Sequence, residues 1–181
     1  MELTTDDRTR LLVLATEAVA AAVCGGPAPV APAGGALDEH RGCFVTLKNA
    51  GHLRGCIGMF EARGPLGEMI VQMARAAATE DPRFRHNPIT TEELPELSVD
   101  LSVLSPLVKT DDPAALRIGV DGIYIVRGGR SGCFLPEVAT ETGWDVETFL
   151  GECCAGKAGL ASDAWRDPAT TVYLFTSEKI P

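Results

Sequence analysis

Two pairs of β-rich runs, each joined by a short glycine-containing stretch, constrain the fold of this chain most strongly. The first pair covers residues 43–48 and 53–60, with Asn49-Ala50-Gly51-His52 between them. The second pair covers residues 122–126 and 132–135. Antiparallel strands can be joined by very short loops, whereas parallel strands need long crossovers. Each pair therefore predicts a β-hairpin and an antiparallel sheet.

Apolar residues at helical spacing precede and follow the first hairpin in the sequence. Residues 4–24 and 65–80 repeat leucine, methionine and alanine at intervals of three and four, and each segment begins with residues that start helices. Residues 98–105 instead alternate, with Val99, Leu101 and Val103 on one side. We expect this strand to join the first hairpin in a largely antiparallel sheet that the two helices cover.

The second hairpin is followed by two shorter helical patterns and a last strand. One helix is expected from Pro136 until Gly143 ends it, another runs through Cys153, and residues 170–176 form the strand. Hairpins mixed with helices that do not alternate regularly indicate the α+β class and not a doubly wound parallel sheet.

Composition excludes several classes of function. With 45% hydrophobic and 23% charged residues, the chain is typical of a globular protein. A net charge of -9 argues against a general polyanion binder, so no nucleic-acid partner is expected. The polar start and the irregular spacing of the six cysteines predict reduced thiols and a cytoplasmic location. The apolar run of residues 11–24 is too short and too often interrupted to span a membrane, so no membrane-spanning segment is expected.

The hexapeptide Leu53-Arg54-Gly55-Cys56-Ile57-Gly58 is the most unusual local sequence. Two glycines inside a strand predict a bulge or a bare backbone surface that something approaches closely. Arg54 could hold an anion or favour the thiolate of a neighbouring cysteine. Cysteine in an apolar strand is also commonly a small buried hydrophobe, so the functional and the packing interpretations both stand.

Other charged residues admit two interpretations each. Asp81-Pro82-Arg83-Phe84 fits either a functional site or a helix stop with a local salt bridge. Lys157 fits an anion contact or a favourable charge at a helix C-terminus. The remaining candidates lie in polar segments where we expect solvated side chains: His40, His52, His86, Glu92, Glu93 and Glu96.

No metal site or cofactor is expected. The chain has no C-x-x-C and no H-E-x-x-H, and Cys153 and Cys154 are adjacent, so they would project in different directions from a helix. The spacing that holds an iron–sulfur cluster for radical chemistry is also missing. Arg127-Gly128-Gly129-Arg130 joins two strands and lacks the length and the lysine of a phosphate-binding loop.

Taken together, several separated segments resemble the AMMECR-type domain family, known in prokaryotes as protein A of the AmmeMemoRadiSam system. The resemblance rests on these segments: Phe44-Val45-Thr46-Leu47, the hexapeptide 53–58, Asp81-Pro82-Arg83-Phe84, Glu93-Leu94, Phe134-Leu135-Pro136-Glu137-Val138, Trp144-Asp145 and Lys157-Ala158-Gly159-Leu160. The chain departs from the family pattern at residues 85–88 and at Glu137.

The resemblance implies a single domain over residues 1–181 with two unequal lobes and a cleft between them. The larger lobe is expected to cover about residues 1–110 and 170–181, and the smaller lobe about 111–169. The family has no established activity. Its genes are often grouped with those of a radical S-adenosylmethionine protein and of a protein similar to extradiol dioxygenases, which are the expected pathway partners.

Two functions from different classes follow as hypotheses. In the first, the protein is a small enzyme with Cys56 as nucleophile or redox thiol. Arg54, Arg83 or Lys157 would supply positive potential, and Asp81 or Glu137 would carry protons. Ligand-binding residues would be Arg83, Glu137 and Lys157 at the cleft, where either carboxylates neutralise the cations or a small anionic ligand does. In the second, the protein is a non-catalytic binding or adaptor protein of the same pathway.

Overall fold

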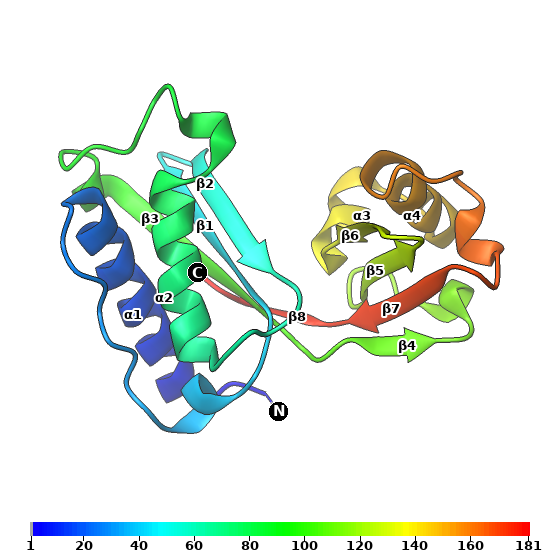
Figure 1. Ribbon diagram of the computed structural model, residues 1–181, viewed down its shortest axis with the longest axis horizontal. Helices are drawn as coiled ribbons and strands as arrows, with labels where there is room; N and C mark the ends of the chain where they lie inside the picture. Colours follow the sequence, from blue (N-terminus) through cyan, green and yellow to red (C-terminus); the bar gives the residue numbers. More distant parts are fainter. Residues whose placement is uncertain (1) are drawn as a thin grey trace. The chain divides into compact units, whose positions relative to one another are not determined.

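The computed structural model describes residues 2–181 and divides them into two compact units. Unit 1 contains residues 2–104 and 178–181, and unit 2 contains residues 105–177. Each unit is built around a four-stranded sheet, with helices alongside (Figure 1). The predicted α+β class with antiparallel sheets is confirmed.

The sheet of unit 1 has the strand order β2-β1-β3-β8. Its strands are β1 (Cys43–Asn49), β2 (His52–Met59), β3 (Leu97–Leu104) and β8 (Ser177–Ile180). Strand β1 pairs with both β2 and β3 in antiparallel fashion, and Val45 lies opposite Ile57 on one side and Leu101 on the other. At the hairpin turn, Ala50 and Gly51 have φ angles of 48° and 79°, which is the left-handed backbone that tight hairpins require.

Two helices cover one face of this sheet, as the sequence predicts (Figure 1). Helix α1 (Thr5–Val23) begins at a capping box in which Thr4 and Asp7 exchange bonds between side chain and backbone. Helix α2 (Leu66–Thr79) follows Pro65, whose ring fixes the backbone entering the helix.

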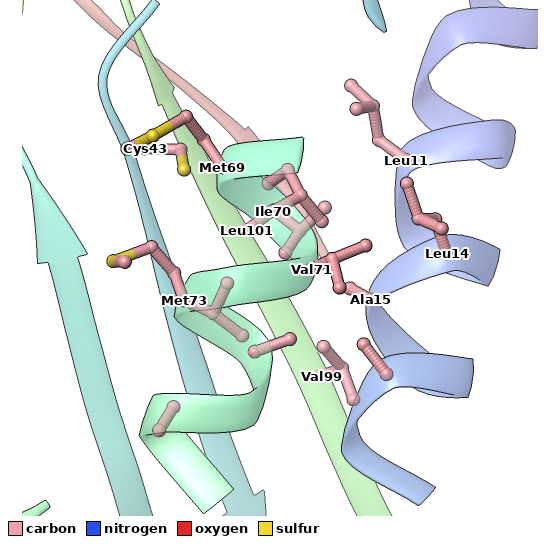
Figure 2. Close-up of a cluster of buried hydrophobic side chains, with 14 of the residues drawn as sticks. Leu11, Leu14, Ala15, Cys43, Met69, Ile70, Val71, Met73, Val99 and Leu101 are labelled. Carbon is pink, nitrogen blue, oxygen red and sulfur yellow. The ribbon is translucent and has the colours of Figure 1, made fainter. Parts of the chain in front are cut away.

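The core of unit 1 lies between the helices and the sheet, and Figure 2 shows side chains of α1, α2 and β3 pointing toward one another. Val99, Leu101 and Val103 of β3 are buried, which confirms the face predicted from their alternation. Leu11, Ile70 and Leu101 have no exposed surface. Burying side chains of this size contributes about 1.5–3 kcal/mol each, so this layer is the main source of stability in unit 1.

Unit 2 has a sheet in the order β4-β7-β5-β6, with neighbouring strands antiparallel. The strands are β4 (Val108–Thr110), β5 (Gly122–Arg127), β6 (Arg130–Phe134) and β7 (Thr171–Phe175). Its helices are α3 (Pro136–Thr142) and α4 (Val146–Glu152), which continues as a π-helical turn over Cys153–Lys157. A core of Ile123, Ile125, Phe149, Leu150 and Val172 holds sheet and helices together.

Two short strands are absent from the sequence-based expectations. Strand β4 has three residues and leaves Val108 64% exposed, and β8 is largely polar, so neither shows the apolar alternation of a half-buried strand. The pairing of β4 with β7 also places both strands in unit 2. The unit boundaries therefore lie at residues 104–105 and 177–178, whereas the expected lobes placed both segments in the larger lobe.

Among residues 2–181, no helix combines the length and the apolar character needed to cross a bilayer.

Candidate functional site

The hexapeptide lies on β2, which is one of the two edge strands of the unit 1 sheet. Leu47 lies opposite Gly55, but Lys48 lies opposite Leu53, so Arg54 is left without a partner on β1. This shift of register is a β-bulge, a feature that redirects a side chain at a sheet edge. Of the two arrangements expected from the paired glycines, the bulge is present.

Arg54 is 9% exposed and is held by a carboxylate. Its Nε donates to Oε1 of Glu93 at 2.9 Å, and its Nη2 donates to Oε2 of the same residue at 3.0 Å. The backbone carbonyl of Pro88 accepts a further bond at 3.3 Å, and the Phe84 ring lies 5.8 Å from the guanidinium carbon. The guanidinium is therefore neutralised and oriented entirely by unit 1.

Glu93 is a residue of this candidate site that sequence reasoning missed, because it was expected to be solvated. Its carboxylate accepts from the Thr90 backbone N–H at 3.1 Å and also binds Arg54 and the Asn49 side chain. The hydrogen bond from Arg54 is the main cause that lowers the pKa of Glu93 below its ordinary value. Nothing in the spacing of residues 54 and 93 could have indicated this pair.

Asp81 and Arg83 close the free edge of β2 at Cys56. The Cys56 backbone N–H donates to Oδ2 of Asp81 at 2.9 Å, and the Cys56 carbonyl accepts from Nη2 of Arg83 at 3.3 Å. The two side chains also bind each other, with Arg83 Nη2 2.6 Å from Asp81 Oδ2. The local salt bridge considered in the sequence analysis is thus present, and it satisfies the backbone groups that a further strand would otherwise bind.

Asp81 is strongly acidic in this setting. Its side chain is buried, and hydrogen bonding from Arg83 is the main cause that lowers its pKa to about 2, with the Cys56 and Arg83 backbone N–H groups adding to the effect. Asp81 is therefore ionised throughout the neutral range and engaged by three donor groups. A group in this state is poorly suited to carry protons at neutral pH.

The Cys56 thiol lies on the face of the sheet away from the helices. Its Sγ is 3.2 Å from the Thr46 hydroxyl, and the residue is half-buried. His40, His52 and His86 are all exposed, as expected. Within residues 2–181, none of these histidines forms a hydrogen bond to Cys56. The thiol consequently has a hydroxyl neighbour and no imidazole base.

The two glycines of the hexapeptide are explained by packing. A Cβ on Gly55 would lie 2.0 Å from the Ala77 carbonyl oxygen of α2, so only glycine permits this approach of strand and helix. A Cβ on Gly58 would lie 2.3 Å from ring atoms of Phe44, the residue directly opposite on β1. Both positions are filled by the protein itself.

Glu137 and Lys157 belong to unit 2. Glu137 is half-buried in the first turn of α3. Lys157 is exposed at the end of the π-helical turn, and its Nζ lies 5.4 Å from the centre of the Phe134 ring. The structure thus brings Arg54, Cys56, Asp81 and Arg83 together in unit 1. The grouping of Glu137 and Lys157 with these four residues stays a prediction.

The pKa values of two further cysteine thiols are raised by burial. All six cysteines are free. Burial raises the pKa of Cys43 to about 12 and that of Cys133 to about 11, so both stay protonated at neutral pH. Across residues 2–181, no group of three or more histidine, cysteine or acidic side chains is placed to hold a metal ion.

Comparison with known proteins identifies the fold and the family together. The crystal structure of the uncharacterised protein PH0010 from Pyrococcus horikoshii superposes with a TM-score of 0.83 at 38% identity, covering 93% of this chain and 88% of that one. A protein of Methanothermobacter thermautotrophicus is 46% identical over 146 residues, which is 77% of this chain and 74% of that protein. Protein TK0174 of Thermococcus kodakarensis is 44% identical over 152 residues, 78% and 73% of the two chains. The AMMECR1 family model matches residues 12–180, and the resemblance that began with a glycine-flanked cysteine is confirmed: the chain belongs to the AMMECR1 family.

Proposed function

We propose that this protein is a non-catalytic binding or adaptor protein. The observation that carries the proposal is that the charged residues around Cys56 are already occupied. Arg54 is paired with Glu93, and Arg83 is paired with Asp81. These ion pairs bind the backbone and side chains at the edge of β2, so we assign them a structural role and not a catalytic one.

The geometry supports an enzyme with a cysteine nucleophile less well. A thiol nucleophile is normally activated by an adjacent base or by an unpaired cation. The carboxylate nearest to the Cys56 backbone is Asp81, whose pKa of about 2 and hydrogen bonds make it a weak base. Arg54 and Arg83 each face a carboxylate at 3.0 Å or less.

We place the contact surface on the face of the unit 1 sheet away from α1 and α2. Phe44, Thr46 and Lys48 of β1 alternate onto this face, and Cys56 lies opposite Thr46 on β2. Lys48 binds Asp100 of β3 at 2.7 Å. An aromatic ring, hydroxyls and a charge pair on one face of a sheet suit contact with another protein better than the enclosure of a small molecule.

The partners that we propose are those implied by the family resemblance, the radical S-adenosylmethionine protein and the dioxygenase-like protein of the same pathway. A small anionic ligand has weaker support, because both arginines have carboxylate partners. Lys157 is the one cation of the expected ligand set that has no carboxylate partner among the described residues.

Binding to these two proteins tests the proposal. We would measure binding of each purified partner by calorimetry without oxygen, using wild type, Ser98→Arg and Thr16→Arg. Ser98 is exposed on the proposed face and Thr16 is exposed on α1, so the two substitutions add the same charge and bulk in different places. We expect Ser98→Arg to weaken binding at least about tenfold and Thr16→Arg to have no effect. Failure of both partners to bind wild type would refute the adaptor function.

Thiol reactivity tests the enzyme alternative. At pH 7, a small alkylating reagent should modify Cys56 no faster than the exposed Cys24, because no base or free cation among residues 2–181 is hydrogen-bonded to the Cys56 thiol. Mass spectrometry of the digested protein gives both rates in one sample. Modification of Cys56 ten or more times faster than Cys24 would restore the nucleophile hypothesis.

A further inference from the structure

Unit 2 contains a pocket that is separate from the hexapeptide and has a volume of about 480 Å³. Strand β4 and the residues after it form one side, the segment from Trp165 to Pro168 forms a second, and the start of β7 forms a third. Pockets that bind small molecules commonly measure roughly 300–1,000 Å³. The volume is therefore sufficient for a molecule of the size of an amino acid.

The apolar part of the pocket offers a flat surface. Trp165 lines it, together with the rings of Pro113 and Pro168. The guanidinium of Arg166 lies over the Trp165 ring, 4.3 Å from its centre, and the partly buried indole also packs against the core of unit 2. A ligand ring can pack against such a surface through stacking and burial.

Most charges at the pocket are already engaged by the protein. Asp167 binds Arg127 at 2.8 Å, and Arg166 binds Glu147 at 2.7 Å. Lys109 and Asp111 are different, because neither side chain forms a hydrogen bond or ion pair within residues 2–181. Both line the pocket: Lys109 lies in β4 at the edge of the sheet, and Asp111 lies in the bend that follows this strand. The pocket therefore presents one free positive and one free negative charge beside an indole.

We propose that this pocket binds a small zwitterion that carries an aromatic ring, the chemical class of the aromatic amino acids. The ligand carboxylate would bind Lys109, its ammonium group would bind Asp111, and its ring would pack on Trp165. A simple anion or a simple cation would leave one of the two protein charges opposed to a like charge or without a partner. This site is independent of the proposed adaptor surface in unit 1.

Thr170 supplies a further polar group at the same place. Among residues 2–181 its Oγ1 has no hydrogen-bond partner and is shielded from solvent, and Thr170 is one of the residues that line the pocket. A buried hydroxyl in this condition is unfavourable. Rotation about the Cα–Cβ bond would let the hydroxyl bind a polar group of the ligand.

Four probes separate the contributions of ring and charge. L-phenylalanine carries the ring and both charges. 3-Phenylpropionate carries the ring and only the negative charge, and 2-phenylethylamine carries the ring and only the positive charge. L-alanine carries both charges without the ring. The chain has two tryptophans, so Trp144→Phe leaves Trp165 as the sole indole reporter. We expect L-phenylalanine to change the fluorescence of Trp165 with a Kd on the order of 0.1–1 mM. The other probes should bind at least about tenfold more weakly.

Variants of the two charges give a crossed test. Lys109→Ala should weaken L-phenylalanine about tenfold and leave 2-phenylethylamine unchanged, because that probe has no carboxylate. Asp111→Asn should weaken L-phenylalanine and leave 3-phenylpropionate unchanged or more tightly bound. Arg63→Ala removes an exposed cation outside the pocket and is the matched control for charge. Thr170→Val should weaken L-phenylalanine several-fold without lowering the melting temperature.

The proposal fails if 3-phenylpropionate or 2-phenylethylamine binds as tightly as L-phenylalanine, because the site would then recognise a single charge. It also fails if no probe binds below about 10 mM, or if Arg63→Ala weakens binding as much as Lys109→Ala. The melting temperature of each variant is measured alongside, so that loss of binding is distinguished from loss of folding.

Discussion

Replacing Glu93 by glutamine should destabilise the protein because it leaves the buried Arg54 charge without its counter-ion. The Arg54 side chain is 10% exposed, and the two hydrogen bonds that it donates to a carboxylate both go to this one residue. Glutamine keeps one acceptor oxygen, but its amide nitrogen would face the donors of Arg54. The substitution therefore removes a charge and introduces a donor opposite a donor.

The cost can be worked from these contacts. Breaking a fully buried ion pair by removing one partner costs about 3–5 kcal/mol. The Glu93 side chain is 25% exposed, so water can replace part of what is lost, and we expect about 2–3 kcal/mol. For a chain of this length each kcal/mol lowers the melting temperature by about 2–4 °C. The expected decrease is roughly 4–12 °C.

Thermal unfolding of wild type, Glu93→Gln and Glu96→Gln measures this cost. Glu96 is exposed three residues away and controls for the chemistry of the substitution. The lowered pKa of Glu93 means that its stabilisation is present above its unfolded pKa and is lost as the pH falls below about 4. The difference between wild type and Glu93→Gln should therefore shrink in acid. Equal melting temperatures for the two variants at pH 7 would refute the role of Glu93.

Three further substitutions test the same region and its core. Asp81→Asn should cost about 2 kcal/mol at pH 7, since the pKa of Asp81 falls from 3.8 to about 2 in the folded protein, and this stabilisation should disappear between pH 4 and 2 in urea titrations. Gly55→Ala should prevent stable folding, because the added Cβ would lie 2.0 Å from the Ala77 carbonyl oxygen. Gly64→Ala is the control: its Cβ has no contact below 3.5 Å, so its melting temperature should stay within a few degrees of wild type. Leu101→Ala should lower the unfolding free energy by about 2–5 kcal/mol, and a loss below 1 kcal/mol would contradict its place in the core.

Local patterns predicted most of the elements. Both hairpins, the two long helices and the strand 98–105 follow from apolar periodicity and turn residues, because each signal acts over a few neighbouring residues. Strands β4 and β8 give no such signal. They exist because a longer neighbour offers backbone partners, and this depends on tertiary structure.

The candidate site was predictable only in part. The Asp81–Arg83 salt bridge joins residues two apart and is within reach of sequence reasoning. The Arg54–Glu93 pair joins residues 39 apart in the sequence. It was not predicted because Glu93 lies in an acidic segment that is typical of solvated side chains. The bulge at Arg54 was one of the alternatives suggested by the glycines, but the side chain that receives the redirected guanidinium could not be identified without the fold.

The edge of β2 shows why these residues act as one unit. An edge strand exposes unpaired N–H and C=O groups, and proteins commonly block them to prevent pairing with other chains. Here the bulge at Arg54 interrupts the edge, and Asp81 with Arg83 binds both backbone groups of Cys56. Glycine at 55 then allows α2 to approach from the helix side. Because side chains already bind the backbone groups of Cys56, strand addition at Cys56 is blocked, which supports placing the proposed contact surface on the face that carries Thr46 and the Cys56 thiol.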